Sequence, residues 1–310
     1  MSQYLLLKRM TVQNANAVAG LTYGFPAITN FLGFSHALSR KLPKELGISL
    51  GGVMVISHET EVHARQPKGW GDYVFALTRN PLTKDGKTAP INEEGRMSMQ
   101  VSLLIEINDL RTGDVQSTET FMNAAKQILP RMRLAGGQIV DIEKVDVSIP
   151  GEEGKMMRRL MPGSVLLDRH DYLVEHFEKN NDSFTDLFDA WCDFSKIKYQ
   201  AIAKEDEPGK ADWQYIPKPN SGYLVPIMAG YRAISDLYEP GKVDQVRDPS
   251  VPVSFVEAAY SIGEWISLHR IAKPEDAMWR YKHKSPWYLA KSKPFSESAI
   301  EPDLEQEMTF

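Results

Sequence analysis

The order of strand-like and helix-like segments in the first 150 residues constrains this 310-residue chain more than any other feature. Short apolar runs rich in β-branched residues predict four strands, and apolar residues at helical spacing predict two helices between them. The predicted strands cover residues 4–12, 47–65, 97–107 and 136–149. This β-α-β-β-α-β order predicts an α+β fold of the ferredoxin-like or RRM-like type, in which an antiparallel sheet carries both helices on one face.

The two helices have recognisable ends. Pro26 fits the first turn of a helix that runs to Leu42. The second helix is predicted to begin at Ser117 or Thr118 and to stop at Pro130. The buried face of the first helix is predicted to consist of one stripe: Ile28, Phe31, Leu32, Ser35, Leu38 and Leu42.

Residues 66–96 separate the second and third predicted strands and contain the turn-forming steps NP and DG. We expect this segment to leave the sheet as a thumb-like hairpin excursion. Its tip carries Arg79, Lys84 and Lys87 and is therefore basic.

Charge is distributed unevenly along the chain. The net charge is −5, but the first 150 residues carry 16 Lys and Arg against 14 Asp and Glu, and the remainder carries 20 against 27. Residues 120–140 contain Lys126, Arg131 and Arg133 and no acid. An acidic chain with a basic N-terminal half is compatible with a nucleic-acid partner for that half.

The sequence offers no support for several catalytic classes. P-loop, G-x-G-x-x-G and HExxH motifs are all missing, and with them the usual signatures of nucleotide hydrolysis, dinucleotide chemistry and zincin proteolysis. One cysteine, Cys192, and seven scattered histidines predict neither disulfides nor a metal site, and we expect no cofactor. The N-terminal apolar run is too short for a signal peptide or a membrane span, so we expect a cytoplasmic protein.

Domain boundaries follow from these patterns. Residues 1–150 form the expected RRM-like domain, with its excursion at about 66–96. Residues 151–293 are expected to form a helical and mixed extension packed on this domain. Residues 294–310 carry five acids and no base, which predicts a disordered acidic tail.

The extension has less regular patterns. Amphipathic stretches predict two helices in 164–194 and one helix over 255–271. The charged, proline-bearing segment 200–221 is predicted to be a surface loop or linker. Residues 278–284 alternate between aromatic and cationic types, which predicts a strand that either stacks on RNA, docks on a protein or forms a solvated edge.

Two segments carry candidate chemistry. His36 lies on a small polar helix face with Gly33 and Arg40, and its imidazole is a candidate general base for metal-independent RNA cleavage. The alternatives for His36 are an RNA contact or a hydrogen-bonded packing role.

The segment RMRLAGG joins the second helix to the fourth strand. Gly136 and Gly137 can turn backbone N–H groups toward an anion while Arg131 and Arg133 supply charge. An ordinary tight turn explains the two glycines equally well.

Several short segments together resemble one known family. They spread from about residue 5 to residue 270, and their joint order is far more specific than any one of them. The chain is similar to the second Csy subunit of the type I-F CRISPR surveillance complex, a Cas-five-like member of the RAMP superfamily. The segments, in order, are QNANAVAGLTYGFP, FLGFSHAL, LTRNPLTKDG, EEGR, RMRLAGG, RRLMPG, GYLVPIMAGY, FVEAAYSIGEW and HR.

This resemblance implies a non-catalytic scaffold that holds the 5′ handle of the CRISPR RNA and pairs with the large Csy subunit. The excursion would be a thumb that reaches the adjacent backbone subunit and the guide RNA, and the glycine segment would be the glycine-rich loop typical of RAMP proteins. Contacts to target DNA and to viral anti-CRISPR proteins stay open, and no membrane partner is expected. The expected RNA-binding residues are Arg79, Asn80, Lys84, Lys87, Arg131, Arg133, Gly136, Gly137, Asn14, Asn16, Arg96 and His36.

Two other functions compete with this scaffold. One is a metal-independent RAMP endoribonuclease that processes CRISPR RNA with His36 as general base. The other is a purely structural adaptor that does not touch RNA.

Overall fold

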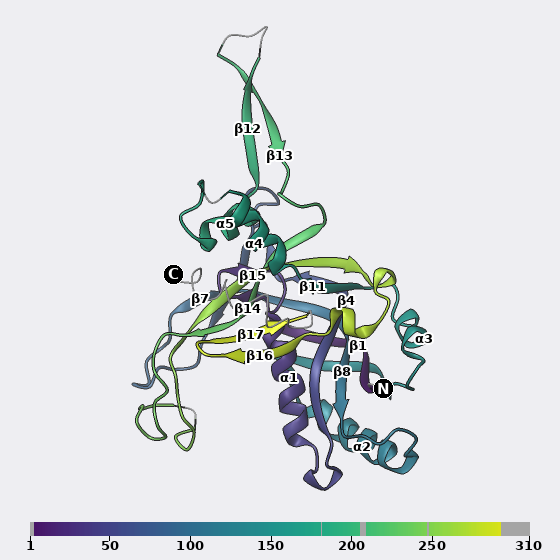
Figure 1. Cartoon of the computed structure of the whole chain (residues 1–310). Helices are drawn as coiled ribbons and strands as arrows, with labels where there is room; N and C mark the ends of the chain where they lie inside the picture. Colours follow the sequence, from purple (N-terminus) through teal and green to yellow (C-terminus); the bar gives the residue numbers. More distant parts are fainter. Residues whose placement is uncertain (1–2, 181, 205–208, 247, 293–310) are drawn as a thin grey trace.

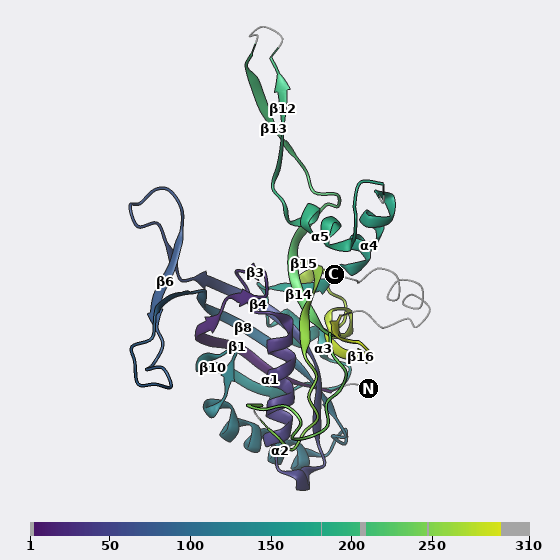
Figure 2. The same ribbon diagram turned by 90° about the vertical axis from the view of Figure 1, so that its left-hand side faces the viewer.

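A ten-stranded antiparallel sheet runs through the body of the molecule (Figures 1 and 2). This computed structural model describes residues 3–292 except 181, 205–208 and 247, so the predicted acidic tail at 294–310 lies outside the described residues. From one edge to the other, the strands are β16 (Arg280–Lys284), β17 (Trp287–Lys291), β14 (Tyr223–Ala233), β15 (Val256–Ser267), β11 (Ser164–Asp168), β4 (Ser49–Val62), β8 (Arg96–Asn108), β1 (Gln3–Asn16), β10 (Gly137–Val147) and β9 (Arg133–Leu134).

The first half of the chain supplies four adjacent strands in the order β4-β8-β1-β10. Helices α1 (Ile28–Lys41) and α2 (Val115–Ile128) pack against these strands in one apolar cluster. The predicted α+β class with a large antiparallel sheet is therefore confirmed. All four predicted strands and both predicted helices of this half are present, with ends that differ by a few residues.

The predicted ends and buried faces of the two helices can be compared with the structure. The Asp114 carboxylate accepts a hydrogen bond from the backbone N–H of Ser117 at 3.0 Å, so the cap of α2 lies three residues before the predicted one. In α1 every residue of the predicted stripe, from Ile28 to Leu42, is buried. The apolar period thus predicted the buried face correctly.

The segment between β4 and β8 leaves the body, as predicted. It forms a small sheet from β5 (Ala64–Arg65), β6 (Val74–Arg79) and β7 (Ile91–Glu94). Figure 2 shows this projection standing away from the main sheet. We call residues 66–94 the thumb.

The prediction of a helix over 255–271 is wrong. These residues form β15 followed by the short 3-10 helix η3 (Leu268–Arg270). Both faces of β15 are covered, so its apolar residues do not alternate and their spacing resembles that of a helix. Gly263 marks the strand, because a Cβ there would lie 2.8 Å from Cδ1 of Leu166 on the neighbouring strand β11.

The prediction of a loop at 200–221 is also wrong for residues 200–203 and 211–216, which form strands. Strands β12 (Lys198–Ala203) and β13 (Ala211–Ile216) pair as a hairpin that projects from the body (Figure 1), and we call residues 198–216 the arm. Both strands are exposed on both faces for most of their length, so no buried face marks them in the sequence. Tyr199 pairs with Tyr215 and Ala201 with Trp213, so the aromatic rings share one face.

The rest of the extension contains both helices and strands, and strands dominate it. The two helices predicted in 164–194 are α4 (His170–Lys179) and α5 (Leu187–Ser195), whereas residues 164–168 belong to β11. The remaining short elements are β2 (Val18–Ala19), β3 (Thr22–Tyr23), η1 (Lys44–Leu46), η2 (Leu129–Arg131), α3 (Glu153–Arg158) and η4 (Pro274–Ala277).

The sheet face opposite α1 and α2 is covered at one end. Tyr4, Leu6, Met54, Ile56 and Leu104 pack there beneath α3 and the segments η3 and η4. The accessible part of this face lies toward the thumb.

The strand predicted at 278–284 is present as the edge strand β16, but the aromatic ring of Trp279, just before it, is not accessible as expected. Trp279 is fully buried and donates a hydrogen bond from Nε1 to the carbonyl oxygen of Leu166 at 2.9 Å. RNA cannot stack on this ring in the folded chain.

Candidate nucleic-acid interface

Three strand ends meet at the thumb-side end of the sheet. Asn16, at the end of β1, pairs with Arg96 at the start of β8, and Gln13 pairs with Gln138 at the start of β10. The backbone N–H of Asn16 also donates to the carbonyl oxygen of Ala135 at 2.8 Å. The tertiary structure thus brings together segments that the sequence separates by more than a hundred residues, and we call this region the sheet end.

The glycine segment forms a tight hairpin turn at the sheet end. Leu134 pairs with Gly137, which leaves a two-residue loop in which Ala135 has φ +49° and Gly136 has φ +74°. Gly137 is required for another reason, because a Cβ there would lie 2.7 Å from the backbone oxygen of Gln13. The turn alternative that the sequence left open therefore describes the backbone geometry, and Arg133 lies beside it with Nη1 3.4 Å from the Gly136 oxygen.

Asn14 and Arg96 lie next to this turn. Asn14 has φ +55° at an irregularity of the β1–β8 pairing, which leaves its side chain exposed. Arg96 donates from Nη1 to the Asn14 carbonyl oxygen at 3.5 Å. Arg96 is also paired with Glu94 at 2.8 Å, and its hydrogen bond to Glu94 lowers the pKa of that carboxyl. The charge of Arg96 is therefore largely compensated within the chain.

Five of the predicted RNA-binding residues are exposed cations without a carboxylate partner in the described part of the chain. Two of them, Arg131 and Arg133, flank the glycine turn. The other three belong to the thumb: Arg79, Lys84 and Lys87. We call these five residues the free cations. Because no described Asp or Glu neutralises them, their charge can act on an external anion.

The thumb presents its cations on an ordered turn. Thr83 donates from its backbone N–H to the Lys87 carbonyl oxygen at 2.8 Å, and Lys87 donates back to the Thr83 hydroxyl oxygen at 3.2 Å. Asn80 is exposed just after the end of β6. The predicted basic tip is thus at the surface and not in the interior.

The base of the thumb contacts the sheet end. The backbone N–H of Ala17 donates to the Gly95 oxygen at 2.9 Å, and the rings of Tyr23 and Phe75 meet edge to face with centroids 5.4 Å apart. The thumb is therefore anchored beside the sheet end.

His36 is not part of this arrangement. It is exposed on α1, and in the described chain its imidazole makes no hydrogen bond, so the packing alternative is wrong. Gly33 on the same face has no neighbouring atom within 4 Å of a built Cβ. In the described chain no Asp, Glu or second His is hydrogen-bonded or ion-paired with His36.

Sequence reasoning missed the partners that define the sheet end. Glu94 neutralises Arg96, and Ala135 receives the Asn16 hydrogen bond. The spacing of Glu94 and Arg96, two residues apart, was the only local signal. Among the described residues, no group of three His, Cys, Asp or Glu side chains could hold a metal ion, and no helix there is long and apolar enough to cross a membrane.

Comparison with known proteins identifies the class. The family model described as CRISPR-associated protein (Cas_Csy2) matches residues 5–290, which places the chain among the CRISPR-associated proteins. The CRISPR-associated protein Csy2 of Pseudomonas aeruginosa (strain UCBPP-PA14) is 40% identical over 307 residues, covering 91% of this chain and 92% of that relative. The chain belongs to the Csy2 family, and the resemblance to the second Csy subunit is confirmed.

Proposed function

We propose that this chain is a non-catalytic subunit of a type I-F Csy complex and that it binds the 5′ handle of CRISPR RNA at the sheet end and the thumb. The observation that carries the proposal is the set of free cations on a chain of the Csy2 family. Phosphate binding needs positive charge that the protein itself has not neutralised. Arg131, Arg133 and the thumb cations meet this condition.

The architecture supports an RRM-type platform. Four strands in the order β4-β8-β1-β10 carry α1 and α2 on one face, which is the arrangement expected for a split βαβ pair. Platforms of this type commonly bind single-stranded RNA. In this chain we assign the RNA to the strand ends, because α3, η3 and η4 cover the other end of the open face.

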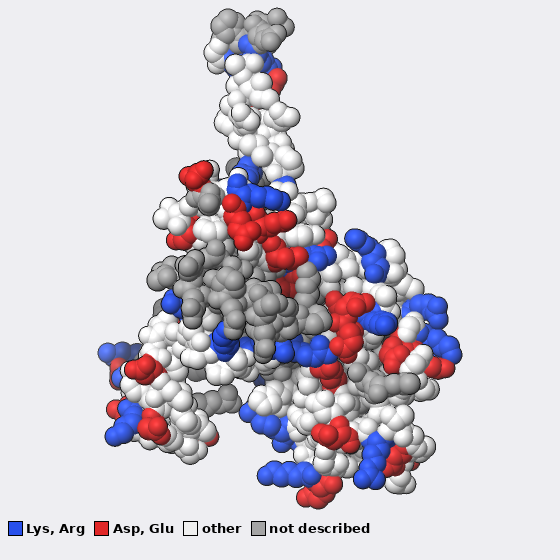
Figure 3. All heavy atoms as spheres, in the orientation of Figure 1, with Lys and Arg blue, Asp and Glu red and all other residues white. Residues whose placement is uncertain are grey.

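The arm supports a protein partner, which we propose to be the large Csy subunit. Trp213 is 70% exposed and Tyr199 is 56% exposed, on a hairpin face that carries no charged residue in its described part. Figure 3 shows the middle of the arm free of charged side chains, with charge near its tip and base. Exposed aromatic surface of this kind is typical of protein interfaces. We propose that the thumb, in turn, meets the adjacent backbone subunit.

A charge-reversal experiment tests RNA binding. The double variant Arg131→Glu/Arg133→Glu and the triple variant Arg79→Glu/Lys84→Glu/Lys87→Glu are compared with Lys44→Glu/Arg111→Glu, whose exposed cations lie near the opposite end of β4 and β8. Each complex is purified with its co-expressed Csy subunits, and its affinity for handle RNA is measured over a range of salt concentrations.

We expect both test variants to bind handle RNA more weakly than the wild type. The logarithmic slope of affinity against salt concentration should become shallower by roughly 0.7 for each phosphate that is no longer neutralised. The control variant should bind as the wild type does. Equal affinities for all three variants would refute the proposal and would favour the structural adaptor.

The endoribonuclease alternative makes an opposite prediction. Incubation with a repeat-containing transcript should produce a cleaved product that disappears in His36→Ala. The isolated position of His36 gives this reaction no second acid or base among the described residues, which two-group proton transfer requires. We therefore expect intact RNA with both the wild type and the variant.

A further inference from the structure

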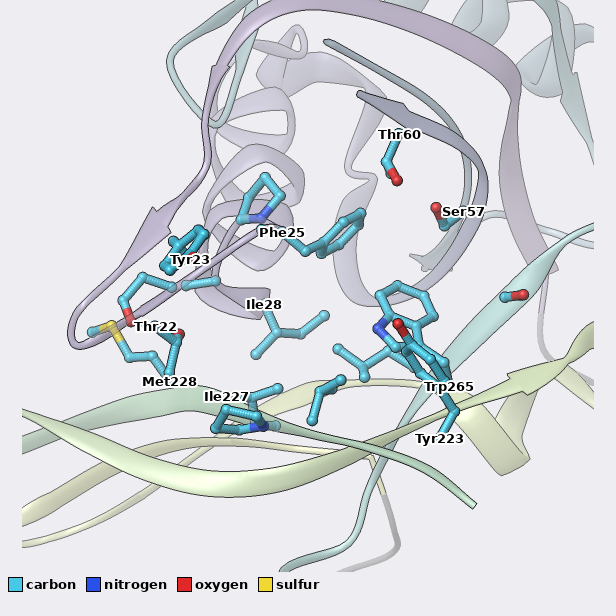
Figure 4. Close-up of a pocket in the computed structure, with 18 of the residues that line it drawn as sticks. Thr22, Tyr23, Phe25, Ile28, Ser57, Thr60, Tyr223, Ile227, Met228 and Trp265 are labelled. Carbon is cyan, nitrogen blue, oxygen red and sulfur yellow. Dashed lines mark hydrogen bonds between the residues drawn. The ribbon is translucent and has the colours of Figure 1, made fainter. Parts of the chain in front are cut away.

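A cavity of about 630 Å³ opens beside the base of the thumb. Its walls are the segment from Ala19 to Ile28, the outer part of β4, and strands β11, β14 and β15 (Figure 4). The volume lies within the range of roughly 300–1,000 Å³ that is usual for small-molecule sites. No motif in the sequence predicted this cavity, because its walls come from five separate segments.

The lining carries no formal charge. Among the described residues that line the cavity there is no Asp, Glu, Lys or Arg. His58 is the one titratable imidazole in the described wall, and both of its ring nitrogens are already bonded: Nδ1 to the Pro162 oxygen at 2.8 Å and Nε2 to the Ser102 hydroxyl at 2.7 Å. Burial and the nearby cations Arg9 and Lys8 lower the pKa of His58, although the Pro162 bond opposes them. A phosphate or carboxylate therefore finds no counter-charge in this cavity.

Aromatic rings and hydroxyl groups face one another across the cavity. Phe25 and Trp265 meet edge to face with centroids 4.9 Å apart, and Figure 4 shows both rings directed inward. Ser57 and Thr60 lie on the β4 wall. Tyr223 stands at the cavity and is 70% exposed. Flat apolar faces combined with hydroxyl groups suit a planar, uncharged, hydrogen-bonding ligand.

The wall nearest the thumb is held in place before any ligand binds. The backbone N–H of Leu21 donates to the Tyr260 hydroxyl oxygen at 3.1 Å, and that of Gly24 donates to the Ala17 oxygen at 2.9 Å. Gly20 permits this close approach, since a Cβ there would lie 2.3 Å from the Tyr260 oxygen. The cavity is thus preformed, which lowers the ordering cost of binding.

The same wall joins the cavity to the sheet end. Ala17, two residues before it, is bonded to Gly95, and Tyr23, which lines the cavity, touches Phe75 of the thumb. The rim of the uncharged aromatic cavity is consequently continuous with the base of the thumb and with the sheet end.

We propose that this cavity receives one unstacked nucleobase of the RNA that the sheet end binds. The inference rests on the proposed RNA-binding function and adds the site of base recognition. Stacking on the aromatic rings supplies affinity, and the hydroxyl groups of β4 offer hydrogen bonds to the base edge. A side chain of a partner protein is the competing occupant.

A double-mutant cycle that combines protein substitutions with abasic RNA variants tests this inference. Handle RNAs with a single abasic nucleotide, one for each position, are bound to complexes that carry wild type, Tyr223→Ala or the conservative Tyr223→Phe. The control is Tyr238→Ala, a tyrosine that is 40% exposed and does not line the cavity. Because Tyr223 is mostly exposed, its replacement leaves the core intact, and circular dichroism verifies the fold of each variant.

We expect one abasic position to weaken binding to wild type by roughly 5- to 150-fold, the range that the stacking of a single base contributes. The complex with Tyr223→Ala should bind intact RNA more weakly than the wild-type complex does. An abasic nucleotide at that same position should reduce the affinity of this variant complex only slightly further. Tyr223→Phe and Tyr238→Ala should keep the full abasic penalty.

Three outcomes overturn the inference. In the first, the loss of affinity caused by Tyr223→Ala and the loss caused by the abasic nucleotide multiply at every position of the RNA. In the second, Tyr223→Ala binds intact RNA with the affinity of the wild type. In the third, a protein subunit dissociates from the Tyr223→Ala complex. If any one of these outcomes occurs while the charge-reversal variants still bind RNA weakly, only the proposed base site is refuted. If the charge-reversal variants also keep full affinity, RNA binding by this chain is refuted as well.

Discussion

Arg280 donates a hydrogen bond from Nε to the carboxylate of Glu106 at 2.8 Å, across 174 residues of sequence. Its Nη2 also bonds Glu106, and it reaches Glu275 at 2.5 Å. The same Glu106 carboxylate accepts the backbone N–H of Gly52 at 2.7 Å. Edge strand β16 is thereby tied to β4 and β8. The cationic side of residues 278–284, which the sequence associated with RNA, is in part committed to this internal network.

The Arg280 network predicts a stability effect. Arg280→Ala leaves the Glu106 carboxylate, whose side chain is 18% exposed, without its charged partner. We expect the free energy of unfolding to fall by about 1.5–3 kcal/mol, the usual contribution of a hydrogen bond to a charged group. Urea denaturation measures the change. Lys284→Ala, at an exposed position on the same strand, serves as the control, and an equal decrease in both variants would contradict the role of the network.

His58 predicts a pH effect. Burial, together with the charges of Arg9 and Lys8, lowers the pKa of His58 from its ordinary value of 6.5. The unfolded chain then binds the proton more tightly than the folded chain, so stability is full above pH 6.5 and falls as the pH drops below it. An NMR titration of the His58 ring should give a midpoint below 6.5. Arg9→Gln should move that midpoint upward, and an unchanged midpoint would argue against the electrostatic cause.

Gly137 predicts a packing effect at the sheet end. In Gly137→Ala the new Cβ would lie 2.7 Å from the Gln13 oxygen and 2.8 Å from the Ala15 Cα, so β1 and β10 must separate. We expect the free energy of unfolding to fall by about 1–3 kcal/mol, as for other overpacked sites. Gly154→Ala in α3, where nothing lies within 4 Å, is the matched control. Thermal unfolding that shifts equally for both variants would show that the close approach is relaxed at little cost.

Replacing Gly33 with alanine is expected to increase the free energy of unfolding, in contrast to Gly137→Ala. Gly33 lies within α1, is exposed and has no atom within 4 Å of a built Cβ. Gly33→Ala should therefore raise the free energy of unfolding by about 0.5–1 kcal/mol in urea denaturation, because alanine restricts the unfolded chain and favours the helix. Handle-RNA affinity should not change. Weaker RNA binding would show that RNA approaches the face of α1 that carries His36.

The strands of the first half were predictable as short apolar runs rich in β-branched residues, although Tyr4, Met54 and Leu104 are buried on the second face of the sheet as well. The helices were predictable because each of them buries one face. A stripe such as that of Ile28 and Phe31 then repeats with the period of the element. Exposure of the thumb cations was predictable for a similar local reason, since turn residues surround them.

The second half was less predictable because β15 is covered on both faces. Apolar and polar residues do not alternate along β15, so the two-residue period that distinguishes a strand from a helix is missing from its sequence. The strands of the arm were not predicted for a different reason. They are exposed on both faces for most of their length, so no buried face marks them.

The sequence by itself determined the family, the strand and helix order of the first 150 residues, and which residue types could bind RNA. Only the tertiary structure decided that Asn16, Arg96 and Ala135 meet, that Arg280 is committed to Glu106, and that five segments enclose a cavity. The physical reason is that periodicity and turn chemistry act over a few neighbouring residues. Ion pairing and enclosure depend instead on which distant strands become neighbours in the sheet.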